Sequence, residues 1–268
     1  MSGAETRLYL CDGGSIELPL RNFVVGAGLA GETVTTPIPW YVITHPRGNV
    51  LIDGGNAPAV AEDPVAHLGA IAASSIVTMQ AEDAVLPTLE RLGIDPLSIR
   101  WVVQTHLHFD HTGALAVIDQ LPNADVLATR TEYEFAHAPD ALAEALYCTV
   151  DYVKPGIRWA LLEPTDDGYD LFGDGTLRCW RTPGHSPGHQ SIEVHLESGA
   201  AFVLTIDAAY TLEHLEERAV SAFMVSASDT IASVRKIRRL AWRADAVPIA
   251  GHDLPQWQTL NRAPQYYR

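Results

Sequence analysis

The chain has 268 residues, 47% of them hydrophobic and 19% charged, with a formal net charge of −15. This composition excludes a disordered chain, and the negative charge disfavours a nucleic-acid partner, because binding phosphates requires a basic surface. The N-terminus "MSGAETRLYL" has no signal-peptide pattern, and no apolar run approaches the ~20 residues of a membrane span, so we expect a cytoplasmic protein with no membrane partner.

The first half of the chain alternates strand and helix patterns. β-branched and aromatic residues bounded by turn residues indicate strands, and apolar residues at helical spacing indicate helices. In chain order these patterns predict an edge strand at 6–12, a hairpin at 39–55 turning at "HPRGN", a helix at 81–92, strands at 99–105 and 124–130, and helical structure within 131–146.

The second half has a similar outline. We predict a hairpin at 169–185 turning at "GDG", a hairpin at 189–207 turning at "ESGA", a helix at 229–243 and a last strand at 246–253. Groups of hairpins separated by helices, occurring twice, indicate two packed mixed sheets with helices outside. The expected fold is an α/β, four-layered αββα sandwich forming a single domain over 1–268.

Polar residues follow four of the predicted strands directly. The segments "WVVQTH", "LRCWRTPGH", "FVLTID" and "VPIAGHD" each run from an apolar strand into a histidine or an aspartate. Sites at strand ends are usual in α/β proteins. If these ends share one edge, then His106, His185, Asp207 and His252 converge there.

The segment "QTHLHFDHTG" concentrates metal-binding side chains. His106 and His108 lie two apart and would share one face of a continuing strand, whereas Asp110 and His111 would point elsewhere if a helix begins there. This spacing supplies ligands for two metal ions. Imidazole and carboxylate ligands suit zinc, and also iron, cobalt or manganese.

Each candidate also has a purely structural interpretation. The cluster could be a solvated, histidine-rich turn, and Asp207 could cap a helix over "AAYTLEHL". Histidines outside the pattern are expected to be surface or packing residues, and the three widely spaced cysteines are expected to be buried apolar thiols. The apolar stretch at 67–80 is either a loop over the site, receiving an acyl chain or a partner subunit, or a buried helix.

These motifs together resemble the metallo-β-lactamase superfamily over essentially the whole length. Within it, "HLHFDHTGA", "TPGHSPGHQS", "LTIDAAYTLEH" and "GHD" are most similar to the N-acyl-homoserine lactonases, in the branch that includes γ-butyrolactone lactonases. The resemblance implies two divalent metal ions, most simply Zn²⁺. It assigns one ion to His106, His108 and His185, the other to Asp110, His111 and His252, and the bridging position to Asp207.

The resemblance also implies a function, namely ring opening of N-acyl-homoserine lactones (quorum quenching) by a metal-bridging hydroxide. Tyr210 would donate a hydrogen bond to the lactone carbonyl, and Asp110 would pass a proton to the leaving oxygen. Phe109 would line the substrate pocket with Tyr210, and Asp53 would support the site. His189 would either support the site as well or only cap a strand. Because related lactonases are commonly dimers, a homodimer is expected.

Other functions of the same fold remain as alternatives. A γ-butyrolactone or other small-lactone hydrolase, such as one acting on 4-pyridoxolactone, fits the same ligands. A β-lactamase is disfavoured because several have cysteine where Asp207 stands, and the thioesterase glyoxalase II because only a short tail follows His252. A binding protein on this scaffold would show broken ligands, and all seven positions are present.

Overall fold

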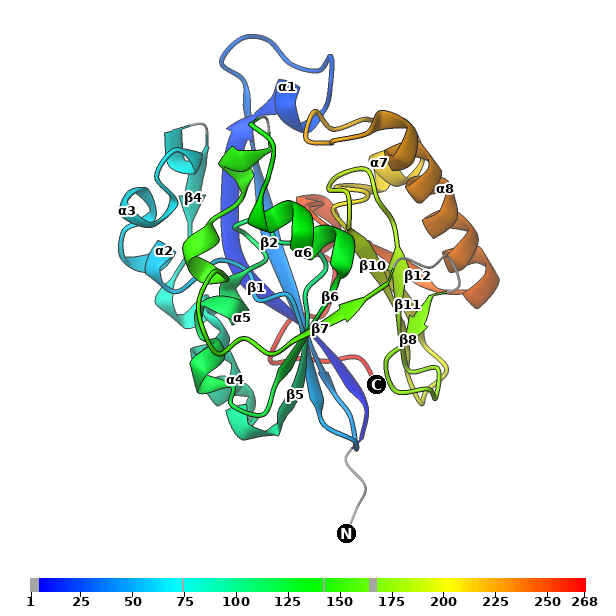
Figure 1. Ribbon diagram of the computed structural model, residues 1–268. Coiled ribbons are helices and arrows are strands. Elements are labelled where there is room, and N and C mark those ends of the chain that lie inside the picture. The colour runs from blue at the N-terminus through cyan, green and yellow to red at the C-terminus, as the bar shows by residue number, and fades with distance from the viewer. Residues whose placement is uncertain (1–4, 74, 142, 164–167) are drawn as a thin grey trace.

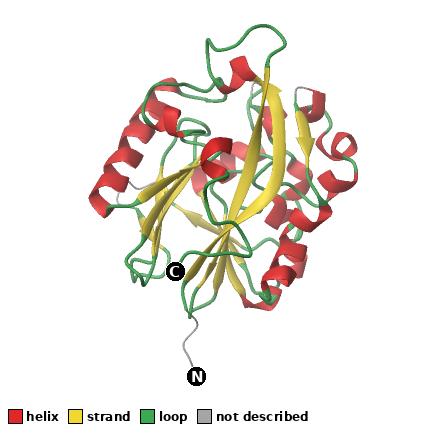
Figure 2. Cartoon of the chain, turned by 180° about the vertical axis from the view of Figure 1, so that it is seen from behind, coloured by secondary structure: helices red, strands yellow, loops and turns green. Residues whose placement is uncertain are grey.

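The computed structural model describes residues 5–73, 75–141, 143–163 and 168–268. Within them lie a seven-stranded and a five-stranded sheet, packed face to face with helices outside (Figures 1 and 2). In spatial order the first sheet comprises β4 (Ile76–Thr78), β1 (Arg7–Pro19), β2 (Thr33–Thr44), β3 (Asn49–Ile52), β5 (Ile99–Val103), β6 (Asp125–Thr129) and β7 (Trp159–Leu162). The second comprises β12 (Val247–Ala250), β11 (Ala201–Ile206), β10 (Gln190–His195), β9 (Leu177–Arg181) and β8 (Tyr169–Asp170).

The helices of the described residues are mostly short. The α-helices are α1 (Leu20–Phe23), α2 (Ala59–Glu62), α3 (Pro64–Leu68), α4 (Val85–Leu92), α5 (Gly113–Ala116), α6 (Arg130–His137), α7 (Leu212–Leu215), α8 (Ala227–Ala244) and α9 (Leu254–Trp257). The 3₁₀ turns are η1 (Ile71–Ala73), η2 (Ala81–Asp83), η3 (Pro96–Ser98), η4 (Ile118–Gln120), η5 (Glu144–Leu146) and η6 (Thr149–Asp151). In the described part of the chain, no helix is long and apolar enough to cross a bilayer.

Three apolar layers separate the four structural layers, as period-two alternation along the strands requires. Val102 of β5 faces the helices outside the first sheet, whereas Val103 faces the second sheet. On β11, Leu204 faces the first sheet and Val203 packs under α7 and α8. The predicted αββα sandwich is therefore confirmed (Figure 2).

Most predicted elements are present, and three differ. The strand predicted at 6–12 continues to Pro19 and is not an edge strand, because β4 pairs with its far half at Ser15–Glu17. The helical stretch predicted within 131–146 is interrupted, since α6 ends at His137 and only the 3₁₀ turn η5 follows. The segment at 67–80 is not a buried helix, because it contains the end of α3, η1 and β4; residue 74 lies outside the described residues.

Strand direction determines where the functional side chains gather. In the first sheet β3, β5, β6 and β7 are parallel, so their carboxyl ends lie at one edge. In the second sheet β9 and β11 flank β10 as antiparallel neighbours, and β12 is parallel to β11. The carboxyl ends of β9, β11 and β12 therefore also share an edge, beside the end of β5.

Candidate metal centre

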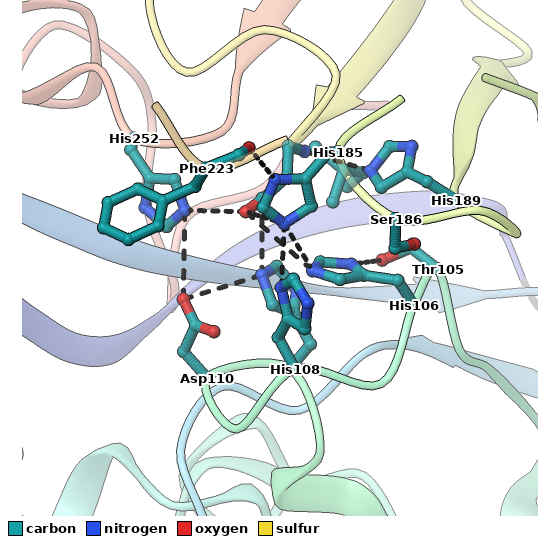
Figure 3. Close-up of polar contacts among 12 residues, drawn as sticks. Thr105, His106, His108, Asp110, His185, Ser186, His189, Phe223 and His252 are labelled. Carbon is teal, nitrogen blue, oxygen red and sulfur yellow. Dashed lines mark hydrogen bonds and ion pairs between the residues drawn. The ribbon is translucent and has the colours of Figure 1, made fainter. Parts of the chain in front are cut away.

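The histidines and aspartates that follow these strands meet in one buried cluster (Figure 3). The segment after β5 contributes His106, His108, Asp110 and His111, and the segments after β9, β11 and β12 contribute His185, Asp207 and His252. All seven are buried, with relative exposures between 0% and 7%. The structure thus brings together the whole predicted ligand set.

One group of donor atoms surrounds Nε2 of His185. This atom lies 3.2 Å from Nε2 of His106, 2.8 Å from Nδ1 of His108 and 3.2 Å from Oδ2 of Asp207. Such separations are those of neighbouring ligands around one ion with metal–nitrogen distances of about 2.0–2.1 Å. The first group is therefore suited to hold a metal ion.

A second group lies on the other side of Asp207. Nε2 of His111 lies 3.3 Å from Oδ1 of Asp207 and 3.7 Å from Oδ2 of Asp110. Nε2 of His252 lies 3.3 Å from Oδ2 of Asp207 and 3.9 Å from Oδ2 of Asp110. The Asp207 carboxylate thus faces both groups of donor atoms.

Hydrogen bonds on the outer ring nitrogens orient four of the histidines. Each outer Nδ1 has an oxygen partner between 2.8 and 3.1 Å, in the pairs His106–Thr105 Oγ1, His111–Asp53 Oδ2, His185–Phe223 carbonyl and His252–Pro37 carbonyl. Carbonyl and carboxylate oxygens can only accept, and the Thr105 hydroxyl already donates its proton to Asp53, so all four nitrogens carry the proton. The inward Nε2 atoms then present lone pairs, as metal ligation requires.

Two buried atoms of the cluster have no hydrogen-bond partner within the protein. They are Nε2 of His111 and Oδ1 of Asp207. A buried polar atom without a partner is costly, and such atoms in a native fold indicate an unseen ion or water. The donor set therefore fits divalent metal ions.

The charge distribution in the cluster favours neutral rings in the first group. Burial and the neighbouring His111 lower the pKa of His106 well below its usual value, and burial with His185 does the same for His108. Burial raises the pKa of Asp207, but His252, His111 and His185 outweigh it and hold that pKa well below the usual range. Asp207 is therefore a carboxylate, the form that binds cations.

Two further predicted residues contact the ligands directly. Asp53 accepts hydrogen bonds from the backbone N–H and the hydroxyl of Thr105, both at 2.8 Å, besides its contact with His111. Nε2 of His189 accepts the backbone N–H of Asp207 at 3.1 Å, so this ring contacts the backbone of a predicted ligand. Asp53 thus contacts His111, and His189 contacts Asp207, on the sides that face away from the centre of the cluster.

The backbone before Asp207 is strained. Ile206 has φ +52°, a left-handed conformation that is rare for a β-branched residue. A Cβ on Gly251 would lie 2.4 Å from the Ile206 carbonyl oxygen, so only glycine fits there. The close approach brings the segments that carry Asp207 and His252 together.

Glu132 is a buried residue of the site region that sequence reasoning missed. Its Oε1 accepts the Leu107 N–H and the Tyr147 hydroxyl, and its Oε2 accepts the Ser186 hydroxyl and the Gly188 N–H, at 2.6–3.2 Å. One carboxylate therefore connects the two loops that carry His106–His111 and His185. The sequence "TRTE" has capping-box spacing, and Thr129 does cap α6, but that pattern does not indicate the second role of Glu132.

A cavity opens over the metal cluster. It has a volume of about 120 Å³, and His108, Asp110, His185, Asp207 and His252 form its polar floor. Its walls are mostly apolar and comprise Ile16, Leu18, Phe23, Ile71, Phe109, Leu146, Tyr210 and Phe223, with Asn22, Thr36 and Ser75 among them. Phe109 and Tyr210, which the resemblance assigns to the substrate pocket, both line this cavity.

The Tyr210 hydroxyl is available as a donor. It lies 3.3 Å from Nδ1 of His185, but that nitrogen already donates to the Phe223 carbonyl. Burial raises the pKa of Tyr210 well above its usual value, and Asp207 and Asp110 act in the same direction. The phenol therefore keeps its proton beside the cavity.

The fold and this cluster define a hydrolase-type metal centre at the edge of an αββα sandwich. The chain matches the model of the Metallo-beta-lactamase superfamily over residues 34–242. It belongs to that superfamily, and the superfamily together with the clustered donors implies bound divalent metal ions.

Within the superfamily, the chain is similar to several proteins named N-acyl homoserine lactonase. The chain is 43% identical over 264 residues to N-acyl homoserine lactonase AttM of Azorhizobium caulinodans, covering 98% of this chain and 99% of that protein. It is 26% identical to N-acyl homoserine lactonase AiiA of Bacillus thuringiensis subsp. kurstaki, and the alignment covers 97% of this chain and 98% of that protein. The fold also superposes on a solved N-acyl homoserine lactone hydrolase that has the product N-hexanoyl-L-homoserine bound at its catalytic metal centre. The TM-score is 0.85 at 25% sequence identity, and the superposition covers 98% of this chain and 99% of that one.

Proposed function

We propose that this protein opens the ring of N-acyl-homoserine lactones by metal-dependent hydrolysis. The observation that carries the proposal is the apolar-walled cavity with two adjoining groups of metal-binding side chains as its floor. Relatives that share 43% of the sequence over almost their full length are named for this activity. The lactone is the small-molecule partner.

We assign one ion to His106, His108 and His185 and the other to Asp110, His111 and His252, with Asp207 shared. Bound divalent ions supply a water of lowered pKa and polarise a carbonyl oxygen. The imidazole and carboxylate set suits Zn²⁺, with iron, cobalt or manganese as the ions that the same ligands accept. Metal analysis of protein purified without added salts tests this assignment.

The residues around the ions have separate roles in ring opening. Water adds to the lactone carbonyl carbon, the ring C–O bond breaks, and the proton lost by the water ends on the leaving oxygen. Tyr210, protonated at the cavity wall, donates a hydrogen bond to the carbonyl oxygen as it gains charge. Asp110 lines the same cavity and carries the proton to the leaving oxygen.

The size of the cavity favours compact substrates. Pockets for drug-sized ligands usually measure about 300–1,000 Å³, whereas this one encloses about 120 Å³. That space suits a lactone ring with a short substituent. It also supports the second candidate function, hydrolysis of γ-butyrolactone or a similar small lactone.

A second cavity provides space for an acyl chain. It has a volume of about 130 Å³ and shares His185, Asp207, Tyr210 and Phe223 with the first. Val220, Met224 and Val234 give it an apolar lining. Rotation of Phe223, which is only half-buried, would connect the two cavities and accommodate a longer tail.

The deciding experiment measures proton release by the zinc-loaded protein with γ-butyrolactone and with homoserine lactones of increasing acyl length. A rise of kcat/KM with acyl length supports the acyl-homoserine lactonase, and Met224→Trp should then reduce the rate for long chains only. Equal or faster turnover of γ-butyrolactone supports the small-lactone alternative. No ring opening by protein carrying its metal would reject both.

We further propose a cytoplasmic homodimer, following the resemblance to related lactonases. Light scattering of the purified protein gives the mass in solution, and a monomer at micromolar concentration would contradict the dimer. Fractionation of producing cells tests the location.

A further inference from the structure

A second set of metal-type ligands lies outside the centre described above. His67 lies in the last turn of α3, and Cys148 and Asp151 lie in the segment that contains η6. Nε2 of His67 lies 3.6 Å from Sγ of Cys148 and 3.1 Å from Oδ1 of Asp151, and the three donor atoms lie within 4.8 Å of one another. A thiol, an imidazole and a carboxylate therefore converge on one point.

The spacing of these atoms matches tetrahedral coordination. Zinc binds sulfur at about 2.3 Å, histidine nitrogen at about 2.0–2.1 Å and carboxylate oxygen at about 2.0–2.2 Å. At a tetrahedral angle these lengths place sulfur and nitrogen about 3.5 Å apart and nitrogen and oxygen about 3.3 Å apart. The observed 3.6 and 3.1 Å need adjustments of no more than a few tenths of an ångström.

The surroundings suit a buried ligand set with an entry path. Cys148 and Asp151 are buried, with exposures of 6% and 2%, while the His67 side chain is 13% exposed and reaches solvent. The other carboxylate oxygen of Asp151 accepts the Thr112 hydroxyl at 2.9 Å, which fixes the carboxylate with Oδ1 facing His67. Hydrogen bonds of this kind hold ligating carboxylates in metalloproteins.

A catalytic triad does not explain the arrangement. In a triad the thiol and the carboxylate contact opposite nitrogens of the imidazole, whereas here both face Nε2 of His67. A simple ion pair between protonated His67 and Asp151 would use the same nitrogen and oxygen atoms, with the Cys148 thiol donating to the His67 carbonyl at 3.7 Å. An ion pair and a metal site are therefore the two explanations of this cluster that an experiment has to distinguish.

We propose that His67, Cys148 and Asp151 form a third metal site, for a zinc-class ion, with water as the fourth ligand. Thiolate and imidazole ligands select zinc and its cobalt or cadmium substitutes over magnesium or calcium. Binding displaces a proton from the Cys148 thiol and leaves His67 neutral. The ion would fasten α3 and η1, which contribute a wall of the cavity through Ile71, to the segment that follows Leu146.

Cobalt spectroscopy separates this site from the catalytic centre. The seven side chains of that centre offer only nitrogen and oxygen, so a thiolate-to-cobalt charge-transfer band in the near ultraviolet can arise only at a cysteine site. Metal-free full-length protein is titrated with Co²⁺. We expect the band, and about three bound equivalents per chain instead of two.

Substitutions identify the cysteine. Cys148→Ser should abolish the band and remove one equivalent, and His67→Gln, at a partly exposed position, should weaken cobalt binding at this site at least 10-fold. Cys179→Ala is the matched control, because Cys179 is another buried free thiol within the sheet core. Absence of the band in the wild-type protein, or its persistence in Cys148→Ser, would overturn the proposal. These readouts do not involve lactone turnover, so they stand apart from the proposed activity.

Discussion

Oδ2 of Asp53 lies 2.8 Å from Nδ1 of His111, although the two residues are 58 positions apart in the chain. The carboxylate can only accept, so it holds the proton on Nδ1 and leaves Nε2 of His111 free to face the metal centre. Thr105 donates twice to the same carboxylate, which fixes its position. Asp53 therefore determines the tautomer of a proposed ligand without contacting the metal.

Asp53→Asn should weaken metal binding by about 10–100-fold while preserving the fold. The asparagine amide can donate to Nδ1 and so favour a proton on Nε2, where it blocks ligation. Competition with a chromophoric chelator measures the affinity. Asp245→Asn, at a left-handed position that asparagine tolerates, is a control for loss of one surface carboxylate. Unchanged affinity in Asp53→Asn would contradict the orienting role.

Asp207→Asn should lose metal as well as activity. Its carboxylate faces both groups of ligands, and its Oδ1 has no partner within the protein. Replacing the anion by a neutral amide removes the shared negative charge, and we expect the variant to retain at least one equivalent less than the wild-type protein after dialysis against a weak chelator. Elemental analysis with circular dichroism provides the measurement. Stoichiometric metal in a folded variant would refute the bridging assignment.

Tyr210→Phe should keep both ions and slow ring opening by about 100-fold in kcat, as expected for loss of one donor to a developing oxyanion. The phenyl ring preserves the stacking on Phe23, whose ring centroid lies 5.4 Å away. Steady-state kinetics with several lactones, together with metal analysis, tests this prediction. An unchanged kcat would remove Tyr210 from the mechanism.

Glu132→Gln should destabilise the protein and loosen the metal centre together. Each carboxylate oxygen accepts one backbone N–H and one hydroxyl. An amide nitrogen in place of either oxygen therefore leaves that backbone N–H without an acceptor, whereas the hydroxyl can turn and accept. At about 1–3 kcal/mol for one buried unsatisfied group, we expect a loss of about 1–3 kcal/mol in unfolding free energy. Denaturant melts of the metal-free and zinc-loaded forms measure it. Glu134→Gln, on the same helix, is the control.

His214 should make the free energy of unfolding fall when the solution becomes acidic. Its Nε2 donates to the Phe23 carbonyl at 3.2 Å, its Nδ1 accepts the Thr211 hydroxyl at 2.8 Å, and burial lowers its pKa. The folded state resists protonation that the unfolded state accepts, so this contribution is complete above about pH 6.5 and declines as the pH falls below it.

The comparison variant for this effect is His214→Gln, which keeps an amide donor but does not titrate. Between pH 6.5 and 5 the wild-type protein should lose stability faster than the variant, by at most about 1.4 kcal/mol per pH unit. Urea melts of metal-free protein at several pH values measure the difference. Parallel pH dependences in the two proteins would contradict the assignment.

Local patterns predicted those parts of the site that depend on strand ends. The apolar run before His106 and the one before Asp207 made both strands recognisable. Within the second sheet, the parallel pairing of β11 with β12 places Asp207 beside His252, and the packing of the two sheets brings these ends next to the end of β5. Glu132 could not be found in this way. Its partners come from two loops far along the chain, and only the tertiary fold shows that one carboxylate serves both.

The segment at 67–80 was ambiguous for a different reason. Its apolar residues follow neither helical nor strand spacing, because η1 and β4 are each only three residues long. Ile71 turns toward the cavity while Val77 packs against β1. Periodicity needs more residues than these elements contain, so no single-sequence argument distinguishes loop from helix there.

The division of the seven proposed ligands between the two sheets has a consequence for how the protein is made. Four come from the loop after β5, and His185, Asp207 and His252 follow from the second sheet. The first ion site lacks His185 and Asp207 until most of the second sheet has been synthesised, and the second site lacks His252 until almost the whole chain has been made. The first sheet must therefore fold on the strength of its apolar core alone, and metal binding becomes a late step that follows the packing of the two sheets.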